Sequence, residues 1–125
     1  VAVSWGETHA DSFLNISGGD EALAARLSLD KLVRPDMPPV FLWHTRDDAS
    51  VPCRNSLVLA NALVEAGVDV SLHLYRMGKH GLSTADEMVY PVDAVPEISW
   101  DVPGWLESEI RFFADCGMKI KDLEA

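Results

Sequence analysis

"FLWHTRDDASVPCRNSL", residues 41–57, joins an apolar run to a histidine, two adjacent aspartates and a Val-Pro pair. The run over 40–45 is bounded by prolines and charged residues, which is typical of a strand covered on both faces. The residues over 54–66 have the composition of a helix, and a glycine, a common helix terminator, follows them. This order predicts a buried strand, with Asp47 and Asp48 just beyond its carboxyl end.

The rest of the chain continues the alternation of strands and helices. The patterns predict a strand at 1–5, a loop at 6–19 with one short turn of helix, a helix at 20–33 capped by Asp20, a strand at 68–76 and a helix near 100–117. Strand, helix, strand order implies parallel strands joined by right-handed crossovers. We therefore expect one α/β domain over 1–125, a three-layer sandwich with about three parallel strands and flanking helices. Because a strand opens the sequence, we also expect a larger fold to contain it.

Composition argues against several classes of partner. The formal charge is −10, from 20 acidic and 10 basic residues, and no Lys/Arg cluster appears, so nucleic acid and anionic membranes are poor partners. No apolar stretch is long enough to span a membrane. Cys53 and Cys116 lie far apart, which predicts free thiols and a cytoplasmic location. The chain shows no glycine-rich phosphate loop and no convergent set of metal ligands, so we expect no cofactor and no metal.

Two side chains follow neighbouring strands at the edge where open parallel sheets collect function. Asp48 comes just after the strand at 40–45, and His80 just after the strand at 68–76. Taken singly, each has a plain structural explanation, because Asp48 could cap a turn, a role that suits Asp47 better, and His80 could be a surface histidine. Taken together, they form the arrangement that an acid–base pair requires.

The segments "HTRDDASVP", "NSL" and "GKHGL" occur in this order, with one helix and one strand before the last. They resemble the C-terminal part of the α/β-hydrolase fold, and within it the acetyl-esterase and xylan-esterase-like group of serine hydrolases, which is related to prolyl oligopeptidases. The resemblance implies that a D-x-x-V-P register selects Asp48 over Asp47 as the triad acid. It also implies that His80 is the base and that the segment at about 6–36 is lid-like. The implied substrate is a small-molecule ester with a short acyl group, such as acetyl on a sugar.

The nucleophile of such a triad is missing from the sequence. A G-x-S-x-G elbow is absent, and so is an H-G-G oxyanion motif. Ser17 in "NISGG" lacks the first glycine and a strand before it, while Cys53 lies near a helix start but suits packing better. We therefore expect this chain to carry the acid and base of an esterase without its serine, and to be inactive alone.

Other interpretations remain open at this point. The chain could be a non-catalytic α/β binding module or part of a prolyl-oligopeptidase-like peptidase. It could also be a dimerisation module, because a bare sheet edge tends to pair with a second copy, which makes a homodimer the physical expectation. Among the remaining aromatic residues, His44 and His73 suit structural roles, His9 could line a substrate pocket, and Trp100 and Trp105 are expected to anchor the last helix rather than stack on a sugar.

Overall fold

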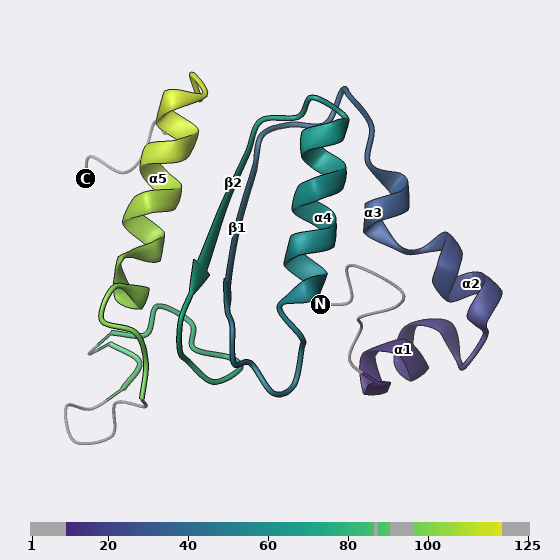
Figure 1. Cartoon of the computed structure of the whole chain (residues 1–125), viewed down its shortest axis with the longest axis horizontal. Coiled ribbons are helices and arrows are strands. Elements are labelled where there is room, and N and C mark those ends of the chain that lie inside the picture. Colours follow the sequence, from purple (N-terminus) through teal and green to yellow (C-terminus); the bar gives the residue numbers. More distant parts are fainter. Residues whose placement is uncertain (1–9, 87, 91–96, 119–125) are drawn as a thin grey trace.

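The computed structural model describes residues 10–86, 88–90 and 97–118. Its centre is a pair of parallel strands, β1 (Val40–Thr45) and β2 (Val70–Tyr75), in register from Val40 opposite Val70 to Thr45 opposite Tyr75. Helix α4 (Arg54–Glu65) covers one face of this pair and α5 (Trp105–Asp115) the other (Figure 1). The predicted three-layer α/β architecture is confirmed. The strand expected at 1–5 lies outside the described residues.

Alternation along β1 explains why its sequence is apolar throughout. Successive side chains of a strand point to opposite faces, so a strand between two helix layers needs apolar residues at every position. Val40 and Leu42 join the buried cluster around α4. On the other face Trp43 stacks on Trp105, with ring centroids 5.2 Å apart, and Phe41 contacts a phenylalanine of α5. The strand is therefore held from both sides, and its carboxyl end has a defined position.

Helix α4 closely follows its predicted limits. It begins at Arg54 and ends at Glu65, and the glycine after its cap, Gly67, has φ of +74°. A left-handed residue at this place ends a helix at little cost when it is glycine. The helix runs antiparallel to both strands, so its amino end lies beside their carboxyl ends (Figure 1).

The helix predicted over 20–33 is instead two short helices, α2 (Glu21–Arg26) and α3 (Leu29–Leu32). The predicted cap is confirmed, since Asp20 accepts a hydrogen bond from the backbone N–H of Leu23 at 3.0 Å. The break falls at Ser28, whose backbone is extended with ψ of 115° and whose hydroxyl bonds the Asp30 carboxylate. Ser28 thus stands at the N-cap of α3, and a helical spacing of leucines does not reveal such a break.

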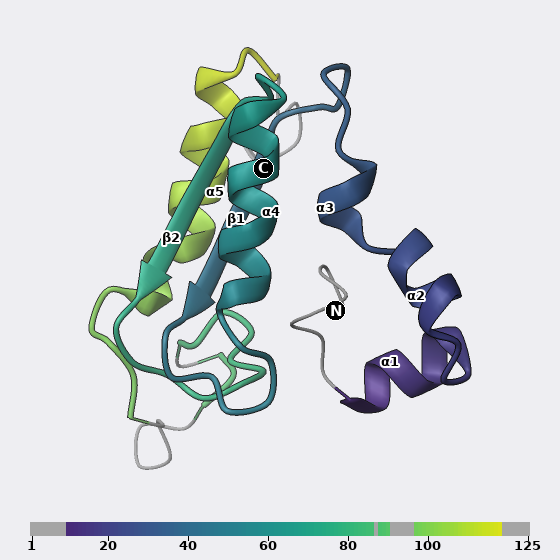
Figure 2. The ribbon, with the colours of Figure 1, turned by 45° about the vertical axis from the view of Figure 1, so that its right-hand side comes forward.

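Helix α1 (Ala10–Ser17) occupies much of the stretch predicted as a loop with one short turn. Gly18 and Gly19, with φ of +63° and +86°, end it. Helices α1, α2 and α3 lie together beyond α4, on the side away from α5 (Figure 2). The described residues contain no helix long and apolar enough to cross a lipid bilayer.

The predicted last helix is confirmed as α5, preceded by a short 3-10 turn at Val102–Gly104. Trp105 anchors it as expected, since its ring stacks on Trp43 and its indole N–H donates to the Ser83 carbonyl at 2.8 Å. Trp100 does not, because its side chain is 91% exposed. The anchoring role predicted for Trp100 is therefore wrong.

Candidate active site

The loops that leave β1 and β2 are bonded to each other. The Thr45 hydroxyl donates to the Gly78 carbonyl at 2.6 Å, and the Gly78 N–H donates to an Asp47 carboxylate oxygen at 2.7 Å. The Arg46 N–H extends the strand pairing to the Tyr75 carbonyl at 2.8 Å. Asp47 therefore braces the neighbouring loop, so the turn-capping role that suited it from the sequence is wrong.

Asp48 and His80 meet at this joined edge. The His80 Nδ1 lies 2.8 Å from Asp48 Oδ2, while Asp48 Oδ1 accepts the backbone N–H groups of Ser50 and Val51, both at 2.9 Å. One carboxylate oxygen thus caps the turn and the other holds the histidine. The Asp48 side chain is 8% exposed and that of His80 is 51% exposed. A buried acid therefore supports a histidine that remains open to solvent.

The hydrogen bond decides which ring nitrogen of His80 carries the proton. A carboxylate only accepts, so Nδ1 is the donor and carries the hydrogen. Nε2 then keeps its lone pair and makes no hydrogen bond to the part of the chain that the structure describes. A neutral imidazole with a free Nε2 beside a fixed carboxylate can take a proton from an adjacent hydroxyl.

The surroundings of Asp48 keep its carboxyl ionised. Burial alone raises its pKa, but hydrogen bonds from the Val51 N–H, from His80 and from the Ser50 N–H outweigh burial, so the pKa lies below its ordinary value of 3.8. Asp48 is therefore a carboxylate at neutral pH. In that state it can stabilise a positive charge that develops on His80.

The His44 ring packs beside the Asp48 carboxylate. Its Nε2 lies 2.9 Å from the Val51 carbonyl and 3.5 Å from Asp48 Oδ2, and its Nδ1 lies 2.8 Å from the Ser56 hydroxyl. A carbonyl only accepts, so Nε2 donates and Nδ1 accepts from Ser56. The supporting role expected for His44 is confirmed, because this ring ties β1, the turn and α4 together around the acid. In the sequence, this role is signalled by a histidine at the second-to-last position of a buried strand.

Gly78 packs tightly between the end of β1 and the following part of its own loop. A Cβ there would lie 2.7 Å from Thr45 Cγ2 and 2.8 Å from Leu82 Cδ1. Gly78→Ala is therefore expected to lower the free energy of unfolding by about 1–3 kcal/mol, because both neighbours are buried and cannot retreat freely. Chemical denaturation measures this change.

Gly104→Ala is the matched control for Gly78→Ala. A Cβ at Gly104 meets nothing within 4 Å, and the backbone there needs no left-handed conformation. We expect this variant to stay within about 0.5 kcal/mol of the wild type. Equal stability of the two variants would contradict the close packing of Gly78 against Thr45 and Leu82.

The two alternative nucleophiles occupy structural positions. The Ser17 hydroxyl donates to the Phe13 carbonyl at 2.7 Å and accepts from the Gly19 N–H at 3.3 Å, at the carboxyl end of α1. Cys53 precedes α4, with its carbonyl accepting from the first turn of that helix. Neither residue is on a strand-to-helix elbow. His9 lies outside the described residues.

His73 is structural, as predicted, with Nε2 at 3.1 Å from the Ser71 hydroxyl and its ring 4.9 Å from that of Phe41. The described residues contain no group of three or more His, Cys, Asp or Glu side chains that could share a metal ion.

Comparison with known proteins identifies the family of this chain. The model of the prolyl oligopeptidase family, a peptidase family, matches residues 5–96, which includes both loops of the site. The chain belongs to the prolyl oligopeptidase family. Among curated proteins, the endo-1,4-beta-xylanase B of Butyrivibrio fibrisolvens is 40% identical over 83 residues, which is 64% of this chain and 13% of that protein.

Two solved structures that are similar to this chain are an ester hydrolase and a hydrolase of acetyl esters and xylosides. A carboxylesterase from Lactobacillus plantarum superposes with a TM-score of 0.69 at 27% identity, over 83% of this chain and 41% of the esterase. An acetyl ester-xyloside bifunctional hydrolase from Caldicellulosiruptor lactoaceticus gives 0.65 at 38% identity, over 78% of this chain and 32% of the hydrolase. The chain therefore has part of the α/β-hydrolase fold, as predicted, and spans less than half the length of these relatives.

Proposed function

We propose that this chain supplies the acid and the base of a serine carboxylic-ester hydrolase, and that a serine outside these 125 residues supplies the nucleophile. The observation that carries the proposal is the 2.8 Å hydrogen bond from His80 Nδ1 to Asp48 Oδ2. It joins two residues from the loops that follow different strands, in the geometry that a triad needs. The family match and the esterase neighbours support it.

The mechanism begins at the free Nε2 of His80. This nitrogen takes the proton of the serine hydroxyl as its oxygen attacks the ester carbonyl, and later returns the proton to the leaving alcohol. Asp48 keeps the ring in the correct tautomer and stabilises the imidazolium that forms. In the second half of the reaction the same nitrogen activates water, which releases the acyl group as a carboxylic acid.

We propose a short-acyl ester of a carbohydrate as the substrate. Support comes from the neighbouring proteins, one of which is an acetyl ester-xyloside hydrolase, and from a curated relative that is a xylanase. A peptidase is the second candidate, favoured by the description of the matching family. Parallel assays with p-nitrophenyl acetate and a prolyl p-nitroanilide distinguish the two.

The test is a chimera in which this chain replaces the matching segment of the Caldicellulosiruptor hydrolase. The chimera is expected to hydrolyse p-nitrophenyl acetate and to bind a fluorophosphonate probe. The 125-residue chain alone is expected to do neither. A stoichiometric fluorophosphonate adduct on the chain alone would overturn the proposal, because the chain would then hold its own nucleophile, and Ser17 would be the first residue to map.

A further inference from the structure

Trp100 differs from the other tryptophans that the structure describes. Trp43 and Trp105 stack on each other, whereas Trp100 is 91% exposed. Its indole N–H makes no hydrogen bond within the described ranges of the chain. An indole offers a large flat apolar face and a polar N–H, and both are open here. This side chain is therefore available for contact with another molecule.

Two hollows lie on either side of Trp100. One, of about 560 Å³, is bounded by β2 and the segment at 98–101, and the other, of about 430 Å³, lies between β2 and the start of α5. Both are lined by Tyr75, Trp100 and Asp101, so they form one groove along the outer edge of β2. Concave surfaces with an aromatic wall are typical of small-ligand sites.

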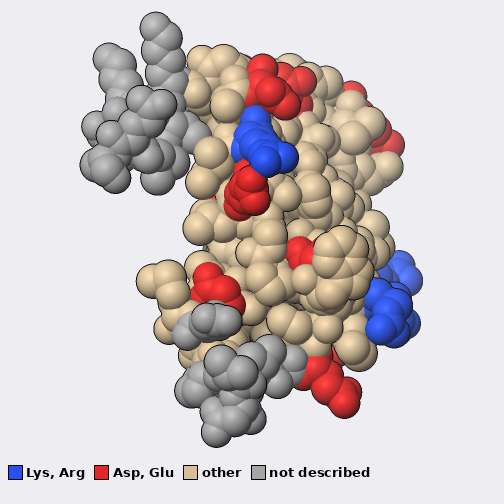
Figure 3. Space-filling view, turned by 90° about the vertical axis from the view of Figure 1, so that its left-hand side faces the viewer, with Lys and Arg blue, Asp and Glu red and all other residues tan. Residues whose placement is uncertain are grey.

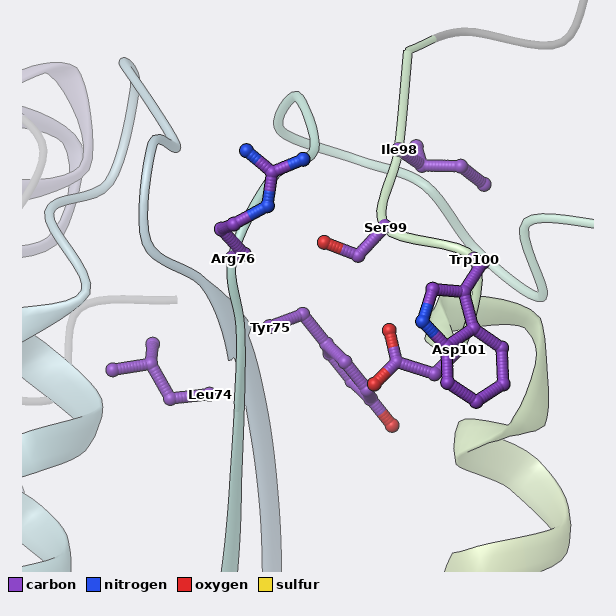
Figure 4. A pocket seen from close by; sticks show the side chains of 7 residues that line it. All are labelled: Leu74, Tyr75, Arg76, Ile98, Ser99, Trp100 and Asp101. Carbon is purple, nitrogen blue, oxygen red and sulfur yellow. The ribbon is translucent and has the colours of Figure 1, made fainter.

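Polar groups converge on the same groove. Figure 4 shows Arg76 across the hollow from Trp100 and Asp101, with the Ser99 hydroxyl between them and the Tyr75 ring extending below from β2 toward Asp101. Arg76 makes no ion pair with any described residue, so its N–H groups are available as donors, and the Asp101 carboxylate is likewise available as an acceptor. Burial, and then the charge of Asp101, raise the pKa of Tyr75, so the phenol stays protonated and can also donate. Donors and an acceptor thus surround one flat apolar surface.

The charge of this side of the molecule disfavours an anionic ligand. The surface around α5 shows separate acidic groups and few basic ones, with uncharged residues between them (Figure 3). The chain as a whole carries −10. An anionic ligand would meet repulsion here. A sugar has a flat C–H face for the indole and hydroxyl groups for Arg76 and Asp101, and it carries no charge.

We propose that this groove binds a β-1,4-linked xylose oligosaccharide, with one sugar ring stacked on Trp100 and its hydroxyls bonded to Arg76 and Asp101. The choice of xylose rests on the carbohydrate-ester substrate proposed above. The groove is tied to the candidate active site, because the Met77 N–H donates to the Ser99 hydroxyl and the Ser99 N–H to the Met77 carbonyl, both at 2.9 Å. Met77 leads directly into the loop of His80, so a chain of sugars held in the groove lies beside that loop.

The experiment titrates the 125-residue chain with unsubstituted xylohexaose by isothermal calorimetry, with maltohexaose as the comparison sugar. Trp100→Ala is expected to weaken xylohexaose binding roughly tenfold, and Trp100→Phe to restore part of it, because a smaller aromatic face remains. Met88→Ala is the matched control. Met88 is also 91% exposed and apolar, and it lines neither hollow.

The proposal is supported if xylohexaose binds more tightly than maltohexaose and only the Trp100 variants lose affinity. No binding by the wild type at millimolar xylohexaose overturns it, and so does an equal loss in Met88→Ala. Thermal melting of each variant checks that the fold is intact. Binding by this chain involves no hydrolysis, so a negative result here leaves the turnover of the chimera as a separate test of the proposed esterase function.

Discussion

Replacing His80 with alanine is expected to lower ester turnover by the chimera about 10⁵-fold or more, because no other group then takes the serine proton. The Nε2 of His80 is the only base of the described site whose lone pair is unoccupied, since both nitrogens of His44 are bonded. Substrate affinity should change far less, because the imidazole acts in the transition state. Steady-state kinetics with p-nitrophenyl acetate separate kcat from KM.

Lys79→Ala is the control for this loss. Lys79 precedes His80 in the same loop, is exposed, and has its ammonium group 5.2 Å from the centre of the Tyr90 ring. Removing the Lys79 side chain leaves the acid–base pair unchanged and costs only a single exposed cation–π contact. We therefore expect turnover to stay within about threefold, which corresponds to the free energy of such a contact. If His80→Ala and Lys79→Ala had the same turnover, His80 would not be the base.

The histidine is half exposed, so its loss should leave the fold in place. We expect the free energy of unfolding of the 125-residue His80→Ala chain to change by no more than about 1 kcal/mol. This separates a chemical role from a structural one.

The parts of the fold that were predictable are those with strong periodic patterns. The run over 40–45 and the helix at 54–65 each carry a pattern and a terminator, and both elements appear where expected. The pairing of Asp48 with His80 followed from topology, because parallel strands bring their carboxyl ends to one edge. Their catalytic role stays a prediction.

The parts that escaped prediction depend on side-chain chemistry with no period. The break at Ser28 is accompanied by a bond from its hydroxyl to Asp30, and the bracing role of Asp47 comes from a hydrogen bond across 31 residues. Trp100 and Trp105 are five positions apart with the same side chain, yet only Trp105 finds a stacking partner. Which tryptophan finds a stacking partner depends on where β1 places Trp43, and a long-range contact of this kind is not encoded in the local sequence.

The second large effect is expected for Asp48→Asn, which should lower chimera turnover about 10⁴-fold. The asparagine oxygen can still accept from Ser50 and Val51, so the turn survives. Its amide group donates where the carboxylate accepted, so His80 Nδ1 must accept and the ring proton moves to Nε2. The nitrogen that should take the serine proton is then already protonated. Nitrogen-15 NMR of the 125-residue chain detects the change of tautomer directly.

Asp47→Asn is the control for Asp48→Asn. Its oxygen keeps the acceptor for the Gly78 N–H and it makes no contact with His80, so both turnover and tautomer should stay close to the wild type. Loss of turnover in Asp47→Asn with full turnover in Asp48→Asn would reverse the assignment of the acid.

Acid titration of stability gives an independent check on Asp48. Its pKa is lower in the folded chain than its ordinary value of 3.8, so the folded state binds the proton less readily than the unfolded state. The stability from this group is present above pH 3.8 and is lost as the pH falls through the lower folded pKa. The gap in free energy of unfolding between wild type and Asp48→Asn should therefore shrink below that pH, as measured by urea denaturation. A constant gap would mean that the carboxylate contributes no charge-dependent stability, and that its bonds to the turn and to His80 are worth no more than those of an amide.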